Sequence, residues 1–377
     1  GVPVVPGTEQ PLQSAEEALR VCEEIGFPVM LKASMGGGGK GMRLIHEKGE
    51  VVEAYHTARS ESLSSFGDDT VYIEKFVEEP HHIEFQILGD NHGNVIHLFD
   101  RECSVQRRNQ KIVEESPSPF LTTDLRKEMG EKAVAAAKAV HYSGAGTIEF
   151  LVDKDRHFYF LEMNTRLQVE HPITEEVVGV DLVKEQIRIA NNEVLHLRQE
   201  DIFQRGHAIE CRICAEDTEN NFMPSPGIIR QLTEPNGIGV RIDSYVYEGY
   251  EIPVYYDPMI GKLIVWATTR AYAIERMRRV LYEYKITGLK TNLSYLKRIM
   301  HNPDFVKGEY NTLFIAKNAR MLQRSNGNNE EIENIAMIAA YMDYLMNLEE
   351  NTSTQLADTR PISRWREFGL QKGVLRI

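Results

Sequence analysis

Apolar and polar positions in the first part of the chain follow a pattern that predicts a small unit of helices and strands. Residues 14–26 are expected to form a helix, because Ser14 begins a capping box and Gly26 closes the segment. The same pattern predicts strands at 28–31, 42–45 and 71–77 and a charged amphipathic helix at about 48–60. We therefore expect an α+β unit over residues 1–76.

A longer, strand-rich region follows, which we place at 77–319. Alternating or continuously apolar segments predict strands at 82–88, 94–103, 146–152, 157–163, 207–215, 226–233 and 259–267. Helices are expected at about 123–141, 269–284 and 291–300.

Residues 320–377 form a third segment with a different composition. It begins with a polar break at 324–329. A helix is then expected with one apolar face, made of Ile332, Ile335, Ala339, Met342 and Met346. Residues 350–363 resemble a linker, and the final apolar cluster of Trp365, Phe368 and Leu370 is interpreted as the start of a further domain.

Composition narrows the function classes. The net charge is −13, from 43 basic and 56 acidic residues, which argues against a nucleic-acid-binding surface. No apolar run approaches the ~18 residues of a membrane span. The 4 cysteines are too few for a disulfide scaffold, which favours a reducing compartment, and we expect a cytoplasmic protein. Because the chain begins at Gly1 without a Met, we expect it to be part of a longer protein.

A glycine-rich loop at 36–41 follows the strand that ends near Lys32. It matches G-x-G-x-x-G, but the dinucleotide motif requires a helix after the last glycine, and a strand is expected here. A Walker A loop is also excluded, because Gly41 follows Lys40 where Ser or Thr is needed. The remaining interpretations are a phosphate-binding flap, with Lys32 as a point charge, or a surface hairpin without a ligand.

The segment 160–172 carries the most chemical information. An apolar strand leads into alternating polar side chains that period two would place on one face, namely Glu162, Asn164, Arg166, Gln168 and Glu170. Glu149 belongs to a neighbouring predicted strand and could meet Glu162. Two carboxylates and an amide oxygen suit Mg²⁺ between nucleotide phosphates, whereas the alternative is a solvated salt-bridge ladder.

Two further features concern basic residues. The cluster at 106–111 is either a functional site or a basic surface turn. Arg212 lies in an otherwise apolar strand, where arginine is seldom buried without an anionic partner.

Taken together, these motifs resemble the biotin carboxylase family over residues 1 to about 319. The resemblance rests on segments at 32–43, 74–75, 102–111, 162–174, 210–217 and 256–263. It implies an ATP-grasp fold, with a glycine-loop lid domain, a larger antiparallel-sheet domain and a C-terminal helical extension. It also implies ATP- and bicarbonate-dependent carboxylation of biotin through carboxyphosphate, with Mg²⁺ or Mn²⁺ as the metal.

The resemblance also implies roles for individual residues. Glu170 would be the general base, Arg212 would hold the biotin ureido oxygen, and bicarbonate would be positioned by Lys111, Arg166, Gln168 and Val169. The nucleotide would be bound by Lys32, Gly38, Gly39, Glu74, Lys75, Val77, His82, Gln106 and Asn109. The metal ligands would be Glu149, Glu162 and Asn164.

The implied partners are a biotinyl carrier domain or protein, a carboxyltransferase subunit and a second copy in a homodimer. From the resemblance we also expect this sequence to lack the family's N-terminal domain, and Asn109 stands where many relatives have histidine. Asn109 and the segment 39–41 look more like propionyl-CoA carboxylase alpha chains. Two alternatives stay open: another ATP-grasp ligase similar to carbamoyl-phosphate synthetase, and a binding or assembly fragment without catalysis.

Overall fold

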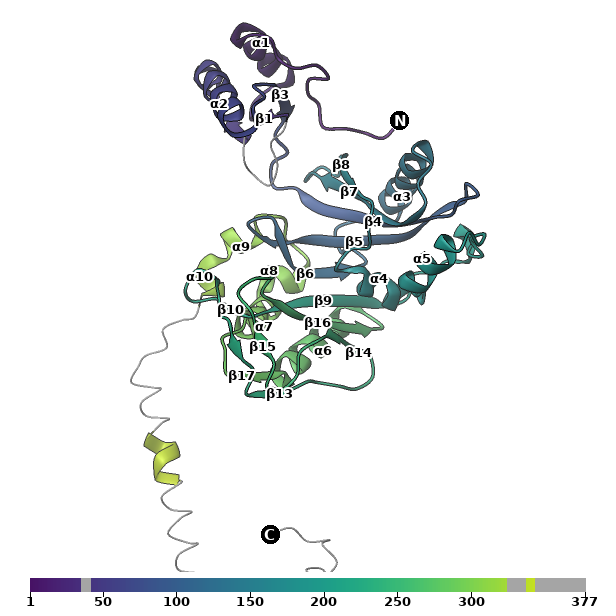
Figure 1. Ribbon diagram of the computed structural model, residues 1–377, viewed down its shortest axis with the longest axis vertical. Coiled ribbons are helices and arrows are strands. Elements are labelled where there is room, and N and C mark those ends of the chain that lie inside the picture. The colour runs from purple at the N-terminus through teal and green to yellow at the C-terminus, as the bar shows by residue number, and fades with distance from the viewer. Residues whose placement is uncertain (35–41, 324–336, 343–377) are drawn as a thin grey trace, which may run out of the picture. The chain divides into compact units, whose positions relative to one another are not determined.

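A computed structural model describes residues 1–34, 42–323 and 337–342 (Figure 1). Residues 1–323 form one compact unit and 324–377 form a second. In the second unit, the described residues 337–342 are helical. The glycine loop, with Gly38 and Gly39, and most of the predicted tail lie outside the described residues.

The first part of the described chain is a small antiparallel sheet packed against two helices (Figure 1). Within the described residues the strand order is β2 (Met42–Ile45), β1 (Val29–Ala33) and β3 (Val71–Lys75). The helices are α1 (Ala15–Ile25) and α2 (Val51–Phe66), the latter preceded by the 3-10 turn η1 (Lys48–Glu50). The predicted N-cap is confirmed, because Ser14 Oγ accepts a hydrogen bond from the N–H of Glu17 at 3.1 Å, while the Glu17 carboxylate accepts from the N–H of Gln13 at 2.7 Å rather than from that of Ser14. The predicted strand–loop–strand arrangement around residues 36–41 is also confirmed for its two strands.

A large sheet forms the centre of the next part, and its strands are all antiparallel. In the described range 42–323 its order is β14 (Val240–Ser244), β16 (Met259–Ala267), β9 (His207–Cys214), β6 (Gln110–Ser116), β5 (Val95–Arg107), β4 (His81–Gly89), β7 (Gly144–Val152) and β8 (Phe158–Asn164). The strands β6 and β9 thus become neighbours although their paired residues lie more than ninety positions apart in the chain. The polar groups described below converge on these two strands together with β4 and β7.

Helices and short strand pairs complete the unit. The helices are α3 (Thr123–Ala139), α4 (His171–Val178), α5 (Leu182–Ala190), the 3-10 turn η2 (Gln199–Asp201), α6 (Arg270–Glu283), α7 (Leu293–His301), α8 (Pro303–Lys307), α9 (Phe314–Lys317) and α10 (Ala319–Leu322). The short pairs are β10 (Glu216–Asp217) with β11 (Met223–Pro224), β12 (Gly227–Ile228) with β15 (Glu251–Ile252), and β13 (Gln231–Thr233) with β17 (Lys285–Thr287). Among the described helices, none is both long and apolar enough to cross a bilayer.

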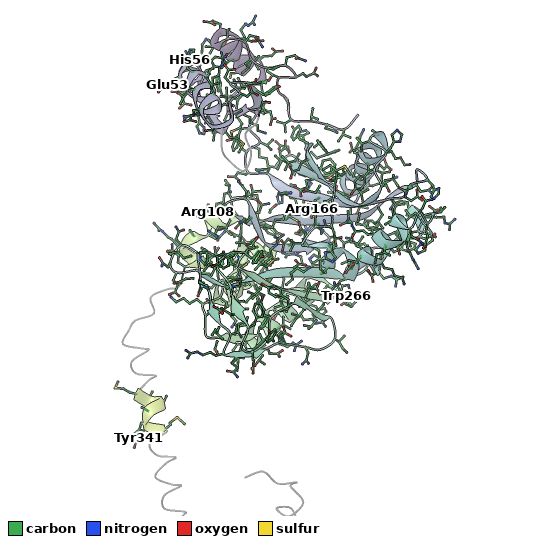
Figure 2. The ribbon with its side chains drawn as sticks, viewed as in Figure 1. Glu53, His56, Arg108, Arg166, Trp266 and Tyr341 are labelled. Atoms are coloured by element: carbon green, nitrogen blue, oxygen red, sulfur yellow. The ribbon has the colours of Figure 1, made fainter. Side chains whose placement is uncertain are left out.

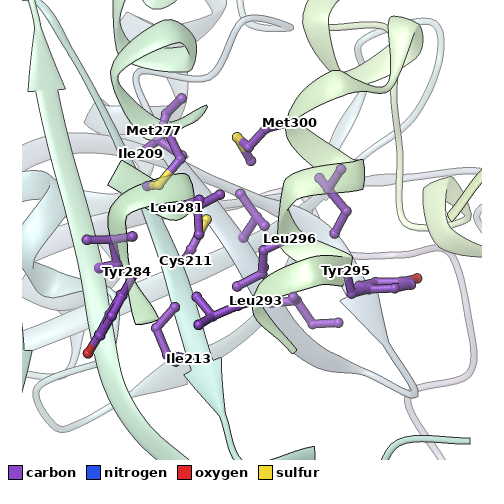
Figure 3. Packing of buried hydrophobic residues seen from close by; sticks show 14 of the residues in the cluster. Ile209, Cys211, Ile213, Met277, Leu281, Tyr284, Leu293, Tyr295, Leu296 and Met300 are labelled. Carbon is purple, nitrogen blue, oxygen red and sulfur yellow. The ribbon is translucent and has the colours of Figure 1, made fainter. Parts of the chain in front are cut away.

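One face of β9 packs against α6 and α7 and determines where its polar side chains point. Ile209, Cys211 and Ile213 are buried in a hydrophobic cluster with residues of both helices (Figure 3). Because neighbouring side chains on a strand point to opposite faces, Glu210 and Arg212 lie on the other face of the sheet. The buried cluster thereby fixes the face on which the candidate site is built.

The structure differs from the sequence predictions at several elements. The strand predicted at 226–233 is two short strands, β12 and β13, which pair with different partners. The strands β6 and β14 and the helices α4 and α5 were not predicted. The prediction that Glu162 to Glu170 share one strand face is wrong, because β8 ends at Asn164 and Glu170 is the N-cap residue of α4.

Candidate active site

Lys111 of β6 lies at the centre of a buried group of carboxylates. Its Nζ lies 2.6 Å from Glu84 Oε2, 2.6 Å from Glu170 Oε1 and 3.2 Å from Glu149 Oε1. The lysine side chain is only 12% exposed. Its three partners come from β4, β7 and the start of α4, so one cation joins elements that are far apart in the sequence.

Glu84 is a member of this group that the sequence predictions missed. It is fully buried and accepts a hydrogen bond from Arg101 Nε at 2.6 Å. Arg101 is itself fully buried and is also bonded to Gln86 and Thr174. The signal was present in the alternation of His82, Glu84 and Gln86 along β4, which places three polar side chains on one face of a buried strand.

Glu170 and Arg212 form a second buried pair beside Lys111. Arg212 Nη2 donates to Glu170 Oε2 at 3.0 Å, and Arg212 Nε donates to Glu114 Oε1 at 2.6 Å. Glu170 is fully buried, and each of its two carboxylate oxygens contacts a cation, Lys111 at Oε1 and Arg212 at Oε2. The prediction that Arg212 has an anionic partner is confirmed by these contacts.

The groups assigned to a metal lie together on β7 and β8. Glu149 and Glu162 are direct cross-strand partners. Asn164 Nδ2 contacts Glu149 Oε1 at 3.0 Å and Glu162 Oε1 at 3.4 Å. Two carboxylates and an amide oxygen form a hard donor set, so these residues fit a Mg²⁺ or Mn²⁺ ion. In the described part of the chain, His82, Glu84 and Glu149 also place ligand atoms within 4.8 Å of one another.

The irregular segment after β8 still returns to this group. Gln168 Nε2 donates to Glu149 Oε1 at 3.1 Å, and Arg166 Nη1 donates to Gln168 Oε1 at 3.1 Å. The Val169 carbonyl accepts from Lys262 Nζ at 2.9 Å. Arg166 is exposed, and its label in Figure 2 lies over the strands of the large sheet. Arg166 and Gln168 are therefore connected to Glu149, as expected. The connection is made by hydrogen bonds from an irregular segment and not by side chains that share one face of a strand.

The residues assigned to the ribose region are connected to the same network. His82 Nε2 lies 2.9 Å from Glu149 Oε2, and Gln106 Nε2 lies 2.7 Å from His82 Nδ1. Asn109 instead lies in the exposed two-residue turn between β5 and β6, labelled at Arg108 in Figure 2. Arg108 and Asn109 have φ of 52° and 63°, a left-handed conformation that asparagine tolerates and that tight hairpins require.

The remaining nucleotide residues belong to the small sheet. Lys32 and Glu74 form an ion pair between β1 and β3. Lys75 Nζ donates to the carbonyl oxygens of Gly26 at 2.9 Å and Phe27 at 2.8 Å. Val77 follows β3 and is partly buried.

Within the buried group around Lys111, the opposite charges of neighbouring side chains shift the pKa values of the acids and the lysine so that they favour the ionised forms. Burial alone would raise the pKa of Glu84, but Arg101 and Lys111 outweigh it and lower that pKa below its usual value. Burial would likewise lower the pKa of Lys111, but Glu84 and the other acids raise it well above the usual range. For Glu149, the effect of burial is outweighed by His82 and Lys111, which lower its pKa to about 2.

Comparison with known proteins places this architecture in a defined class. Residues 1–198 match the family described as the carbamoyl-phosphate synthase L chain, ATP binding domain. Residues 210–317 match the biotin carboxylase C-terminal domain. The fold is thus that of an ATP-grasp enzyme.

Individual relatives narrow this class further. The chain is 57% identical over 315 residues to a biotin carboxylase of a Nostoc species, covering 84% of this chain and 70% of that protein. It is 56% identical over 322 residues to the chloroplastic biotin carboxylase of Arabidopsis thaliana, covering 85% and 60%. It is 52% identical over 317 residues to the mitochondrial propionyl-CoA carboxylase alpha chain of Sus scrofa, covering 84% and 43%.

Solved structures agree with these relatives. The biotin carboxylase domain dimer of Hydrogenobacter thermophilus 2-oxoglutarate carboxylase, in complex with MgADP, ADP and bicarbonate, matches with a TM-score of 0.79 at 48% identity, covering 86% of this chain and 72% of that one. Biotin carboxylase from Campylobacter jejuni matches with a TM-score of 0.79 at 49% identity, covering 84% and 71%. The chain belongs to the biotin carboxylase family of ATP-dependent ligases.

Proposed function

We propose that this protein catalyses the ATP- and bicarbonate-dependent carboxylation of biotin, the first half-reaction of a biotin-dependent acyl-CoA carboxylase. The observation that carries the proposal is the position of Glu170, a fully buried carboxylate between Lys111 and Arg212. The same two cations can hold the bicarbonate anion beside this carboxylate, so Glu170 is placed to accept the bicarbonate proton as the anion attacks the γ-phosphate and ADP leaves.

Glu170 would act as the general base. Bicarbonate is a weak nucleophile at neutral pH, so removal of its proton as it attacks the γ-phosphate lowers the barrier. Lys111 and Arg166 would hold the anion through charge, and Gln168 would orient it through a hydrogen bond. The resulting carboxyphosphate reacts readily with water, so exclusion of water would be needed until biotin is carboxylated.

Arg212 would act on the second substrate. When biotin N1′ loses its proton, negative charge develops on the ureido oxygen, and a guanidinium group placed there stabilises it. Glu114 holds Arg212 from behind at 2.6 Å, which fixes the orientation of the guanidinium group.

The nucleotide would be shared between two groups of residues. Lys32 would offer a point charge to the phosphates, and Gly38 and Gly39 would contribute backbone N–H groups. We assign the adenine to Glu74, Lys75 and Val77, and the ribose region to His82 and Gln106. Asn109 stays a predicted nucleotide-binding residue. Glu149, Glu162 and Asn164 would hold Mg²⁺, which offsets charge on the phosphates when bound.

Replacing Glu170 by Gln tests the assignment of the base. We expect ATP affinity within about twofold of the unchanged protein and a loss of roughly 10²–10⁴-fold in bicarbonate-dependent ATP hydrolysis. Glu176→Gln on the same helix is the matched control, because its side chain is 31% exposed and lies 4.0 Å from Arg241. Activity retained in Glu170→Gln would remove Glu170 from this role.

Two alternative functions can be tested, namely a ligase similar to carbamoyl-phosphate synthetase and a binding fragment without catalysis. The test measures which second substrate supports ATP turnover and whether turnover occurs at all. The purified chain can be supplied with ATP and bicarbonate together with either free biotin or ammonia. Turnover that requires ammonia would favour a ligase similar to carbamoyl-phosphate synthetase. Nucleotide binding without any phosphate release would favour a binding fragment.

The partners and the location are part of the same proposal. A biotinyl carrier and a carboxyltransferase would supply the substrate and use the product, and the second subunit of a homodimer is expected from the resemblance. The acyl-CoA carboxylated in the second half-reaction would be selected by that carboxyltransferase. A cytoplasmic location is supported by cysteines that are free throughout the described residues, although several relatives are chloroplastic and the Sus scrofa relative is mitochondrial.

A further inference from the structure

Glu210 is a buried acid that the proposed mechanism does not use. It lies in the middle of β9 with no exposed surface, and in the described part of the chain neither of its carboxylate oxygens has a hydrogen-bond partner. Glu114 Oε1 accepts from Arg212, but Glu114 Oε2 is also without a partner there. Two buried acids therefore present oxygens that lack a donor.

These two acids face each other across the sheet. Glu114 of β6 and Glu210 of β9 are direct cross-strand partners. Such partners have Cβ atoms about 4.5–5.5 Å apart, within reach of two glutamate side chains. If both were ionised, their charges would repel in a medium of low dielectric constant, and Glu210 would be an unpaired buried charge. One proton removes the repulsion and supplies the missing donor.

The cations near Glu210 are already engaged with other groups. On β16, Lys262 Nζ donates to the Val169 carbonyl at 2.9 Å and lies 3.3 Å from Asp243. On β9 itself, Arg212 is bonded to Glu114 and Glu170.

The helices packed against β9 add no donor for Glu210. At the start of α4, Glu170 is bonded to Lys111 and Arg212, and His171 Nδ1 lies 2.8 Å from the Gln168 carbonyl oxygen. The later acids of α4, Glu175 and Glu176, face Arg241. The helices α6 and α7 cover the opposite face of β9 (Figure 3). On that face, Glu115 pairs with Arg270 and His207.

We propose that Glu114 and Glu210 hold one proton between them, and that this shared proton keeps Arg212 directed toward Glu170. With one proton, the pair carries a single negative charge, which Glu114 presents to Arg212 Nε, while Arg212 Nη2 remains on Glu170. Loss of the proton would place a second negative charge behind Arg212 and draw the guanidinium group away from Glu170. Glu210 is thus a positioning residue that acts through Arg212.

Both acids have raised pKa values, so Glu114 is the first of the two to release its proton as the pH rises, and the pair then holds one proton on Glu210. Burial, with repulsion from Glu170, raises the pKa of Glu114 to about 7 despite the opposing effect of Arg212. Burial and the neighbouring Glu114 raise the pKa of Glu210 well above its usual range. A raised pKa means that the folded state binds a proton that the unfolded state releases, so stability falls as pH rises from the ordinary value toward the folded value.

The pH dependence of unfolding tests the shared proton without any assay of activity. Denaturant unfolding of the chain and of Glu210→Gln is compared between about pH 5 and pH 7. We expect the unfolding equilibrium constant of the unchanged chain to rise relative to the variant by up to about tenfold per pH unit. Glu128→Gln, at an exposed position of α3, is the control that should leave this slope unchanged. Parallel curves for the unchanged chain and Glu210→Gln would overturn the proposal.

Infrared spectroscopy tests the same proton in the unchanged chain, even if the variant does not fold. We expect the carbonyl band of a protonated carboxylic acid at neutral pH, and we expect it to disappear as the pH is raised. Where Glu210→Gln folds, the band should be absent from its spectrum. A spectrum without this band at neutral pH would contradict a shared proton.

The effect on Arg212 rests on the proposed function and has its own measurement. In the active enzyme, the alkaline limb of the pH profile of bicarbonate-dependent ATP hydrolysis should move to higher pH in Glu210→Gln. An unchanged limb, together with a positive infrared result, would refute the link to Arg212. Absence of hydrolysis in the unchanged enzyme would refute the proposed function, and the infrared and unfolding results would still decide whether the proton is shared.

Discussion

Lys111→Met removes the cation on which three buried carboxylates converge. The Nζ atom lies 2.6 Å from Glu84, 2.6 Å from Glu170 and 3.2 Å from Glu149, and the side chain is 12% exposed. Removing one partner from a buried ion pair costs about 3–5 kcal/mol, because the other charge stays buried. Glu84 keeps Arg101 and Glu170 keeps Arg212, so we expect a loss at the lower end, about 3 kcal/mol.

Denaturant unfolding measures this loss directly. A decrease of about 3 kcal/mol in the free energy of unfolding corresponds to a rise of more than about a hundredfold in the unfolding equilibrium constant. The matched control is Lys290→Met, because the Lys290 side chain is 67% exposed and makes an ion pair with Asp217 at 2.6 Å. An exposed pair of this kind is worth about 0–1 kcal/mol.

The loss should also depend on pH with a defined sign. The pKa of Glu84 lies below its ordinary value of 4.5, because Arg101 and Lys111 outweigh the effect of burial. The stability gained from this shift is complete above the ordinary pKa and is lost as the pH falls through the folded value. The deficit of Lys111→Met should therefore be largest near neutral pH and shrink below about pH 4.5. A deficit no larger than that of Lys290→Met, or one that grows on acidification, would refute this reasoning.

Three further perturbations test other parts of the molecule. Glu115→Gln should lower the free energy of unfolding by about 3 kcal/mol, because Arg270 would lose its buried partner, and an unchanged melting temperature would contradict this. Lys32→Ala should weaken ATP binding roughly 10–100-fold in a calorimetric titration, and unchanged affinity would count against its phosphate contact. Removal of Mg²⁺ with EDTA should weaken ATP binding to the unchanged protein more than to Glu149→Gln, and equal losses would argue against Glu149 as a metal ligand.

The elements that could be predicted from the sequence are those whose pattern is local. The helix α1 was predicted from its capping box, and β16 from an apolar run that agrees with its observed bounds. The helix α4 was missed because the alternating polar residues before it favoured a continuing strand. Pro172 in its first turn and Gly179 at its C-cap were the available signals for a helix.

The sequence predicted many of the residues that form the site, but it did not predict which of them contact one another. The resemblance to biotin carboxylases named Lys111, Glu170 and Arg212, which the structure brings into contact. The partners Glu84 and Glu114 were missed, because pairing across a sheet depends on a register that is not visible in the sequence. Glu114 and Arg212, for example, are 98 residues apart in the chain.

Consecutive glutamates in β6 have a consequence for how this protein tolerates change in length. Glu114 faces Arg212, whereas Glu115 faces Arg270 on the opposite side of the sheet. Deleting one residue between the Asn109 turn and these glutamates would move each following side chain to the opposite face of the sheet. Arg212 and Arg270 would then both lose their glutamate partners. Substitutions in the turn do not change the number of residues, so each glutamate stays on its own face of the sheet. Loop engineering at this hairpin should therefore add or remove residues only in pairs within the strand, or remain within the turn itself.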